Sequence, residues 1–225
     1  GPDMGIKPGI IADVPDGAPS VTIKADAISF SAKFVEVANL EQAEWCQLIK
    51  QDNDDCWVGF KFSEGERPMD SLMFELNGSA GKSRIVQTGA FVNGRPLLGR
   101  TAQKERREST FEMTFDRRKE VWCTRLRPTF ERMALYENIS SIPSEAKGVY
   151  RYLDVNDELL YLGKGNIRDC LASRGRDEWG IRKIEFSIIA NDEDSLRWMH
   201  HYVTEYRSNH GEMPAMKRIR GLELP

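Results

Sequence analysis

The sequence has few of the features that mark membrane, secreted and zinc-binding proteins. No apolar run approaches the ~20 residues needed to span a bilayer, and nothing near the start resembles a signal peptide. No Cys-x-x-Cys pair and no histidine at zinc spacing accompany the scattered cysteines, which are Cys46, Cys56, Cys123 and Cys170. We therefore expect free thiols, no membrane partner and an intracellular location.

The chain also lacks an excess of positive charge and a phosphate-binding loop. It has 32 Lys and Arg against 35 Asp and Glu, so any contact with nucleic acid must come from a local basic face. Gly81-Lys82-Ser83 matches the end of a phosphate loop, but the first glycine of that motif would fall on Leu76. A hydrophobic content of 40% and a charged content of 30% are typical of a globular protein.

The pattern along the chain predicts an α+β protein with two domains. Gly1-Pro2-Asp3 before Met4 resembles the scar left by proteolytic removal of a tag, and glycines and prolines up to residue 20 predict a flexible arm. Residues 21–130 are expected to form a β-rich domain with one early helix. Residues 131–146 are expected to form a linker or a short helix, followed by a small α/β domain over 147–225.

The β-rich region resembles no family, and its elements are predicted from local pattern alone. Asn39 is a candidate N-cap for a helix over 40–50, and Asn93-Gly94 is typical of a hairpin turn. Strands are predicted from period-two alternation and short apolar runs at 21–37, 56–62, 71–76, 84–88, 90–92, 109–115 and 120–124.

The most basic stretch lies between Arg100 and Arg132, with ten Lys or Arg against six acidic residues. Aromatic residues are interleaved with these charges. Basic loops with aromatics suit phosphate contact and base stacking. The candidate nucleic-acid contacts here are Arg106, Arg107, Arg117 and Arg118. The alternative, a solvated hairpin rim without a ligand, stays open at this point.

Two tripeptides organise the last third of the chain. Gly148-Val149-Tyr150 and Tyr161-Leu162-Gly163 lie in apolar runs separated by the polar turn 154–158, which predicts an antiparallel hairpin. Tyr150 and Tyr161 would then lie on neighbouring strands with their rings on one face. Asn166 is a candidate N-cap for a helix from Ile167, and a strand over 184–189 and a long helix from Asp192 follow.

This order of elements resembles the GIY-YIG nuclease domain over residues 147 to about 220. The resemblance implies a domain built from a hairpin, a helix, a strand and a long helix, and it implies that this domain hydrolyses phosphodiesters. It implies that the paired tyrosines lie beside the scissile phosphate, where one helps to deprotonate water. It further implies a phosphate-binding arginine on the first helix and a glutamate on the later helix that binds one divalent metal, usually Mg²⁺, because the reaction builds negative charge.

The sequence departs from this pattern at two of four positions. Tyr150 and Tyr161 match, and Lys164 occupies a frequently basic position, but Cys170 stands where the arginine is expected. Arg174, one helical turn later, is the geometric substitute. Met199 occupies the glutamate position in the preferred alignment, and Glu205 occupies it in the other. The active site is therefore expected to be degenerate, with unknown metal ligands.

Three functions remain open on the sequence. The first is a nucleic-acid-binding protein with weak or absent cleavage, whose expected partner is DNA, with RNA as the alternative; its C-terminal contacts would be Lys164, Arg168, Arg176, Arg182 and Lys183. The second is an active endonuclease that requires Mg²⁺ and uses Arg174 with Glu205 or Glu193. The third is a protein-interaction module built on an inactive nuclease fold.

Overall fold

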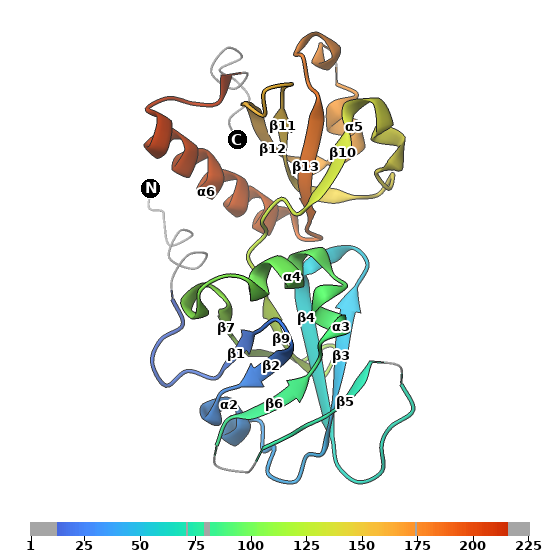
Figure 1. Ribbon diagram of the computed structural model, residues 1–225, viewed down its shortest axis with the longest axis vertical. Helices are drawn as coiled ribbons and strands as arrows, with labels where there is room; N and C mark the ends of the chain where they lie inside the picture. Colours follow the sequence, from blue (N-terminus) through green and yellow to red (C-terminus); the bar gives the residue numbers. More distant parts are fainter. Residues whose placement is uncertain (1–12, 71, 79–81, 174, 216–225) are drawn as a thin grey trace. The chain divides into compact units, whose positions relative to one another are not determined.

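The computed structural model describes residues 13–70, 72–78, 82–173 and 175–215, and Figure 1 shows its elements. The chain divides into two compact units, Asp13–Arg127 and a second that begins at Pro128. Each combines helices with antiparallel β-sheet, which confirms the predicted α+β class. In the described part of the chain, no helix is both long and apolar enough to cross a membrane.

The N-terminal unit contains two antiparallel sheets. The first has the strand order β6-β2-β1-β7 and consists of β1 (Ser20–Ile23), β2 (Ala27–Phe30), β6 (Arg84–Gln87) and β7 (Thr110–Glu112). The second has the order β5-β3-β4-β9-β8 and consists of β3 (Trp45–Gln51), β4 (Asp54–Ser63), β5 (Met73–Glu75), β8 (Thr114–Asp116) and β9 (Val121–Arg125). Their core includes an aromatic cluster in which the Phe30 ring lies between 5.2 and 5.6 Å from those of Phe34, Phe60 and Phe62.

Short helices complete this unit: α2 (Ala32–Val37), α3 (Ala90–Asn93), α4 (Pro96–Ala102) and the 3₁₀ turn η1 (Arg106–Glu108). Ser31 caps α2 by accepting a hydrogen bond from Phe34 N, and α2 buries Phe34 and Val35. A buried arginine, Arg84, joins separate loops by donating to the carbonyl oxygens of Leu40, Ala43 and Leu76.

Four local predictions in this unit are wrong. The predicted helix over 40–50 is instead strand β3, which is paired on both sides and buries alternate residues Cys46 and Leu48. The early helix is α2, within the segment predicted as continuous strand. The predicted strand 90–92 is helix α3, and Asn93-Gly94 separates α3 from α4 rather than closing a hairpin. The predicted hairpin of strands 109–115 and 120–124 is confirmed only in part: β8 pairs with β9, but β7 pairs with β1 in the other sheet.

The C-terminal unit is one antiparallel sheet with the strand order β10-β13-β11-β12. Its elements are β10 (Arg132–Leu135), η2 (Tyr136–Ser141), β11 (Lys147–Leu153), β12 (Leu159–Asn166), α5 (Ile167–Leu171), η3 (Arg176–Glu178), β13 (Lys183–Ile188) and α6 (Asp192–His210). Figure 1 shows α5 and α6 on either side of this sheet. The predicted succession of hairpin, helix, strand and long helix is confirmed, including the Asn166 cap, which accepts from Asp169 N at 3.0 Å.

The expectation of a linker or short helix over 131–146 is wrong for its first part. Arg132–Leu135 forms the edge strand β10, paired antiparallel with β13, and a 3₁₀ turn follows. β10 contributes Ala134 to the core of the C-terminal unit. The segment therefore belongs to the folded C-terminal unit.

Candidate functional site

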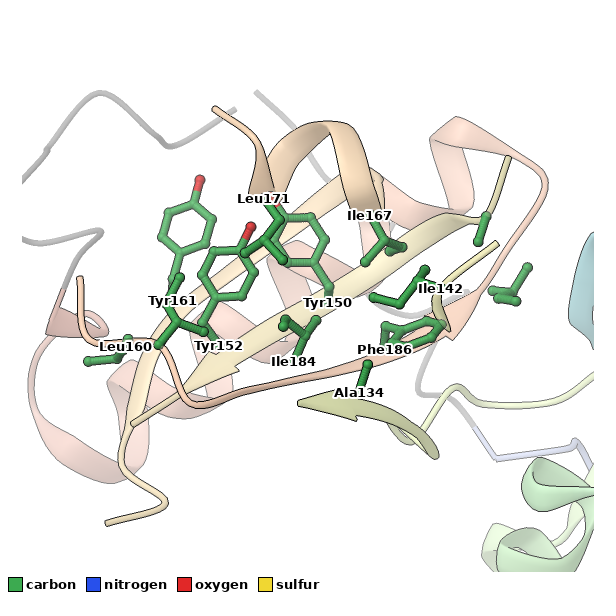
Figure 2. Packing of buried hydrophobic residues seen from close by; sticks show 13 residues of the cluster. Ala134, Ile142, Tyr150, Tyr152, Leu160, Tyr161, Ile167, Leu171, Ile184 and Phe186 are labelled. Carbon is green, nitrogen blue, oxygen red and sulfur yellow. The ribbon is translucent and has the colours of Figure 1, made fainter. Parts of the chain in front are cut away.

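Three tyrosines, rather than two, lie together on one face of the C-terminal sheet (Figure 2). Tyr152 faces Tyr161 across β11 and β12, whereas Tyr150 faces Gly163. The ring centroids of Tyr150 and Tyr152 are 5.0 Å apart, those of Tyr152 and Tyr161 are 5.6 Å apart, and those of Tyr150 and Tyr161 are 6.2 Å apart. The prediction that Tyr150 and Tyr161 share a face is confirmed, but the central ring, Tyr152, was not anticipated.

The two tripeptide glycines provide space that a side chain would fill. A Cβ on Gly163 would lie 2.5 Å from Tyr150 Oη, so the Tyr150 ring can cross the neighbouring strand only over a glycine. A Cβ on Gly148 would lie 1.9 Å from the backbone oxygen of Ser187 on β13. Gly163 thus allows the Tyr150 ring to lie over β12, and Gly148 allows β13 to lie close to β11.

The tyrosine side chains are buried. Tyr150 is 2% exposed, Tyr152 0% and Tyr161 4%. Burial raises the pKa of Tyr150 well above its usual value, and the neighbouring Tyr152 and Cys170 raise it further. Burial also raises the pKa of Tyr152, and the nearby Arg176 charge offsets this only in part. The phenols of Tyr150 and Tyr152 therefore stay protonated at neutral pH.

An arginine and a tryptophan from the segment after α5 cover the tyrosine rings. The Arg176 guanidinium lies 5.2 Å from the Tyr161 ring centroid and 4.1 Å from that of Trp179. Arg176 is itself buried, and it has no carboxylate partner within the described residues. Its charge is held by aromatic faces, so this predicted nucleic-acid contact is packed inside the fold.

Cys170 occupies the position that the resemblance gives to the phosphate-binding arginine. Its thiol lies beside the Tyr150 hydroxyl and donates to the backbone oxygen of Lys164 at 3.8 Å. The predicted substitute, Arg174, lies outside the described residues. Arg168, on the same helix, donates to the backbone oxygen of Ile142 at 3.4 Å, so its side chain extends toward the segment that precedes β11.

The long helix α6 packs on the opposite face of the sheet. Successive strand residues point to opposite faces, so Arg151 points away from Tyr150 and Tyr152. The Arg151 guanidinium lies 4.5 Å from the Phe130 ring centroid, and the Phe130 ring lies 4.9 Å from that of Tyr202 on α6. The helix therefore lies on the Arg151 side, with the sheet between it and the tyrosines.

Neither Glu205 nor Glu193, the candidates for the metal-binding glutamate, lies beside the tyrosines, because both belong to α6 on the opposite face of the sheet. Met199 is buried on α6, and Glu205 is half-exposed on the same helix with its carboxylate 3.8 Å from His201 Nε2. Glu193 is exposed in the first turn of α6, which begins at Asp192.

The tyrosine face does not fit the magnesium ion that the resemblance implies. A hard divalent cation takes oxygen ligands, above all carboxylates, whereas the groups that cover these rings are a guanidinium, a thiol and an indole. Across the described ranges, no three His, Cys, Asp or Glu side chains are grouped so that they could hold a metal ion. No step is therefore assigned to a metal.

The other predicted basic contacts of this unit are dispersed. Lys183 forms ion pairs with Asp157 at 3.0 Å and Glu185 at 3.8 Å. Arg182 is exposed beside a cavity of about 260 Å³, and Lys164 is half-buried on β12. Lys164 follows Gly163 in β12, so it points to the face that α6 covers. Lys183 pairs with Leu153 and Lys164 with Val149, so both lysines lie on the Arg151 side of the sheet, four positions apart along β11.

In the N-terminal unit, the four predicted arginines are exposed in two short segments. Arg106 and Arg107 lie in η1, where Arg107 pairs with Asp13 at 3.4 Å. Arg117 and Arg118 lie in the turn between β8 and β9. The second segment therefore offers two adjacent, exposed guanidinium groups.

Comparisons with protein-family models, with curated proteins and with solved structures find no match.

Proposed function

We propose that this protein binds nucleic acid without cleaving it, and that its C-terminal unit keeps the frame of a GIY-YIG domain but not its reactive groups. The observation that carries the proposal is the burial of the tyrosines. A general base must reach the proton that it removes and must have a pKa near the working pH. Tyr150 and Tyr161 are shielded from water, and the pKa of Tyr150 is raised.

The positions that would supply charge stabilisation support the same proposal. Cys170 replaces the cation that would contact the phosphate, and the Glu205 carboxylate belongs to the helix on the opposite face of the sheet. Removing one preorganised charge-stabilising group typically costs ~3 kcal/mol of transition-state stabilisation. With both groups displaced, the remaining rate would be several orders of magnitude lower.

Local basic surface supports the binding part of the proposal. The net charge of -3 excludes attraction over the whole surface, so binding depends on exposed and locally clustered cations. Arg117 and Arg118 are adjacent and exposed, whereas Arg176 is buried and Lys183 is ion-paired. The N-terminal unit is thus proposed to make the main phosphate contacts.

The test is a combined binding and cleavage assay. Labelled single- and double-stranded DNA and RNA are incubated with the protein in Mg²⁺, in Mn²⁺ or in chelator, and are then resolved on native and denaturing gels. We expect a shift that weakens as salt rises, because phosphate contacts release counterions. We expect no cleavage in any metal, with Tyr150→Phe and the control Tyr206→Phe indistinguishable from wild type.

Two outcomes would overturn this proposal. Metal-dependent cleavage that is lost in Tyr150→Phe and kept in Tyr206→Phe would establish an active endonuclease. A wild-type protein that shifts no nucleic acid, even at low salt, would refute binding and favour a protein partner.

A further inference from the structure

The hairpin tip formed by residues 115–120, which are the end of β8 and the turn to β9, combines an exposed ring with exposed cations. Phe115 is 46% exposed, and no other Phe, Tyr or Trp of the described residues is as exposed. An isolated aromatic on the surface is a stacking platform only if it is held in place. The surrounding contacts meet this condition.

The Phe115 ring is supported from beneath by a row of aromatic side chains. Phe115 faces Trp122 across β8 and β9, and their ring centroids are 5.2 Å apart in an edge-to-face arrangement. Trp122 in turn lies 5.0 Å from Phe34, also edge-to-face, and Phe34 is fully buried. The core therefore fixes the position of Phe115 from one side, and solvent reaches the other.

The turn itself is also fixed. Asp116 Oδ1 accepts hydrogen bonds from the backbone N–H groups of both Arg118 and Lys119, each at 3.0 Å. The Lys119 ammonium lies 4.5 Å from the Trp57 ring centroid. Lys119 therefore lies against Trp57, whereas Arg117 and Arg118 are exposed in the same ordered turn.

Neither Arg117 nor Arg118 forms an ion pair within the described residues, although other basic side chains of this unit, such as Arg125 with Asp54, do. An unpaired guanidinium next to an ordered aromatic is suited to a ligand that alternates phosphates with planar rings. In a duplex, base faces are already stacked on each other. Only an unpaired base can offer its face to Phe115.

We propose that the tip of the β8–β9 hairpin binds single-stranded nucleic acid, with an unpaired base stacked on Phe115 and the flanking phosphates contacted by Arg117 and Arg118. This inference rests on the proposed function and names its substrate class. It predicts a preference for single strands over the corresponding duplex. Either sugar satisfies this chemistry, so the test includes both DNA and RNA.

The test measures fluorescence anisotropy of labelled oligo(dT), oligo(U) and a mixed-sequence duplex against the full chain. We expect Phe115→Leu, which keeps apolar contact with Trp122 but removes the flat ring, to weaken single-strand binding about 10-fold. Duplex binding should change far less. Val37→Ala, at another exposed apolar position of the same unit, is the control and should bind like wild type.

The arginines are tested through the salt dependence of binding. Replacing both residues in Arg117→Gln/Arg118→Gln should reduce the slope of log K against log salt by about 1.4 for a single strand, because each lost phosphate contact contributes ~0.7. The matched control is Lys24→Gln/Lys61→Gln, which removes two other exposed cations of this unit and should leave the slope unchanged. Thermal unfolding of every variant confirms that the fold is intact.

A third measurement uses the wild-type chain alone. A photoreactive 5-iodouracil placed within oligo(dT) is irradiated with the protein, and the modified peptide is identified by mass spectrometry. Adducts on Phe115 are expected. If wild type binds single strands but the adducts and the variant effects lie elsewhere, this inference fails and the proposed function stands. If wild type binds no nucleic acid, the proposed function fails first.

Discussion

The phenol ring of Tyr150 lies directly over Gly163 of the neighbouring strand. A Cβ at position 163 would stand 2.5 Å from Tyr150 Oη, 2.6 Å from Tyr150 Cζ and 2.8 Å from Tyr161 Cε2. Real side chains do not approach this closely, so the glycine is required by the position of the two rings. The packing of the tyrosines accounts for one glycine of the motif without any reference to catalysis.

We expect Gly163→Ala to destabilise the C-terminal unit by ~1–3 kcal/mol, because the buried rings must shift to make room for the methyl group. Denaturant unfolding monitored by tryptophan fluorescence measures the effect. The control is Gly99→Ala in α4, where the nearest atom to a new Cβ is 3.7 Å away. At this position the alanine should raise the free energy of unfolding by a few tenths of a kcal/mol or more, because alanine favours the helix more than glycine does. Equal effects of the two substitutions would contradict the close packing described for Gly163.

The buried phenol of Tyr150 gives a prediction about alkaline stability. Its pKa in the folded state is raised above the value of about 10 that it has in the unfolded chain. The folded state therefore holds this proton when the unfolded state has lost it, and the stabilising contribution is complete below about pH 10 and is lost as pH rises above that value.

Wild type should lose free energy of unfolding more steeply above about pH 10 than Tyr150→Phe, which has no proton to lose at this position. Denaturant unfolding at a series of alkaline pH values gives the two slopes. Tyrosinate absorbance followed on the folded protein should show delayed ionisation in wild type. Parallel stability curves for the two proteins would contradict the burial of this hydroxyl.

Arg176 is expected to be a structural residue. Its planar guanidinium lies against the rings of both Tyr161 and Trp179, a contact that a lysine ammonium does not reproduce. Arg176→Lys should therefore cost ~2 kcal/mol of stability. Arg182→Lys at an exposed position should change stability by less than about 0.5 kcal/mol. If Arg176→Lys instead leaves stability unchanged and weakens nucleic-acid binding, Arg176 contacts the ligand.

Arg84 is expected to be essential for the stability of the N-terminal unit. It donates to three backbone carbonyls at 2.7, 2.7 and 2.9 Å, and removing it leaves buried acceptors unpaired. Arg84→Met should cost ~3 kcal/mol or more, since each unsatisfied buried group costs ~1–3 kcal/mol. Arg67→Met, which removes one longer hydrogen bond from an exposed residue, is the control. Similar melting temperatures for the two variants would contradict this role.

Local patterns predicted the C-terminal unit well because its signals are local. The hairpin around 154–158, the Asn166 cap and the long helix from Asp192 each depend on residues within a few positions of one another. The same reasoning missed Tyr152, although the alternation of a strand places it on the face of Tyr150. Applying the two-residue alternation of a strand to β11 would have identified Tyr152 as the third ring of this face.

Local patterns were wrong where pairing partners decide the structure. Residues 45–51 have mixed spacing that suits a helix, but β4 and β5 on either side hold them as a strand. Residues 132–135 form a strand only because β13, about fifty residues later, offers a free edge. In both cases the strand is stabilised by hydrogen bonds to other segments, which are the adjacent β4 and the later β5 for residues 45–51 and the distant β13 for residues 132–135.

Local sequence is enough to predict the hairpin, its two glycines, the cap of α5 and the absence of the expected arginine and glutamate from their motif positions. The tertiary structure alone decided which charges reach solvent. It buried Arg176 against aromatic rings, separated Glu205 from the tyrosines by the thickness of a sheet, and left Phe115 exposed beside Arg117 and Arg118. Burial depends on what packs against each side chain, and that is fixed by contacts between residues far apart in the chain.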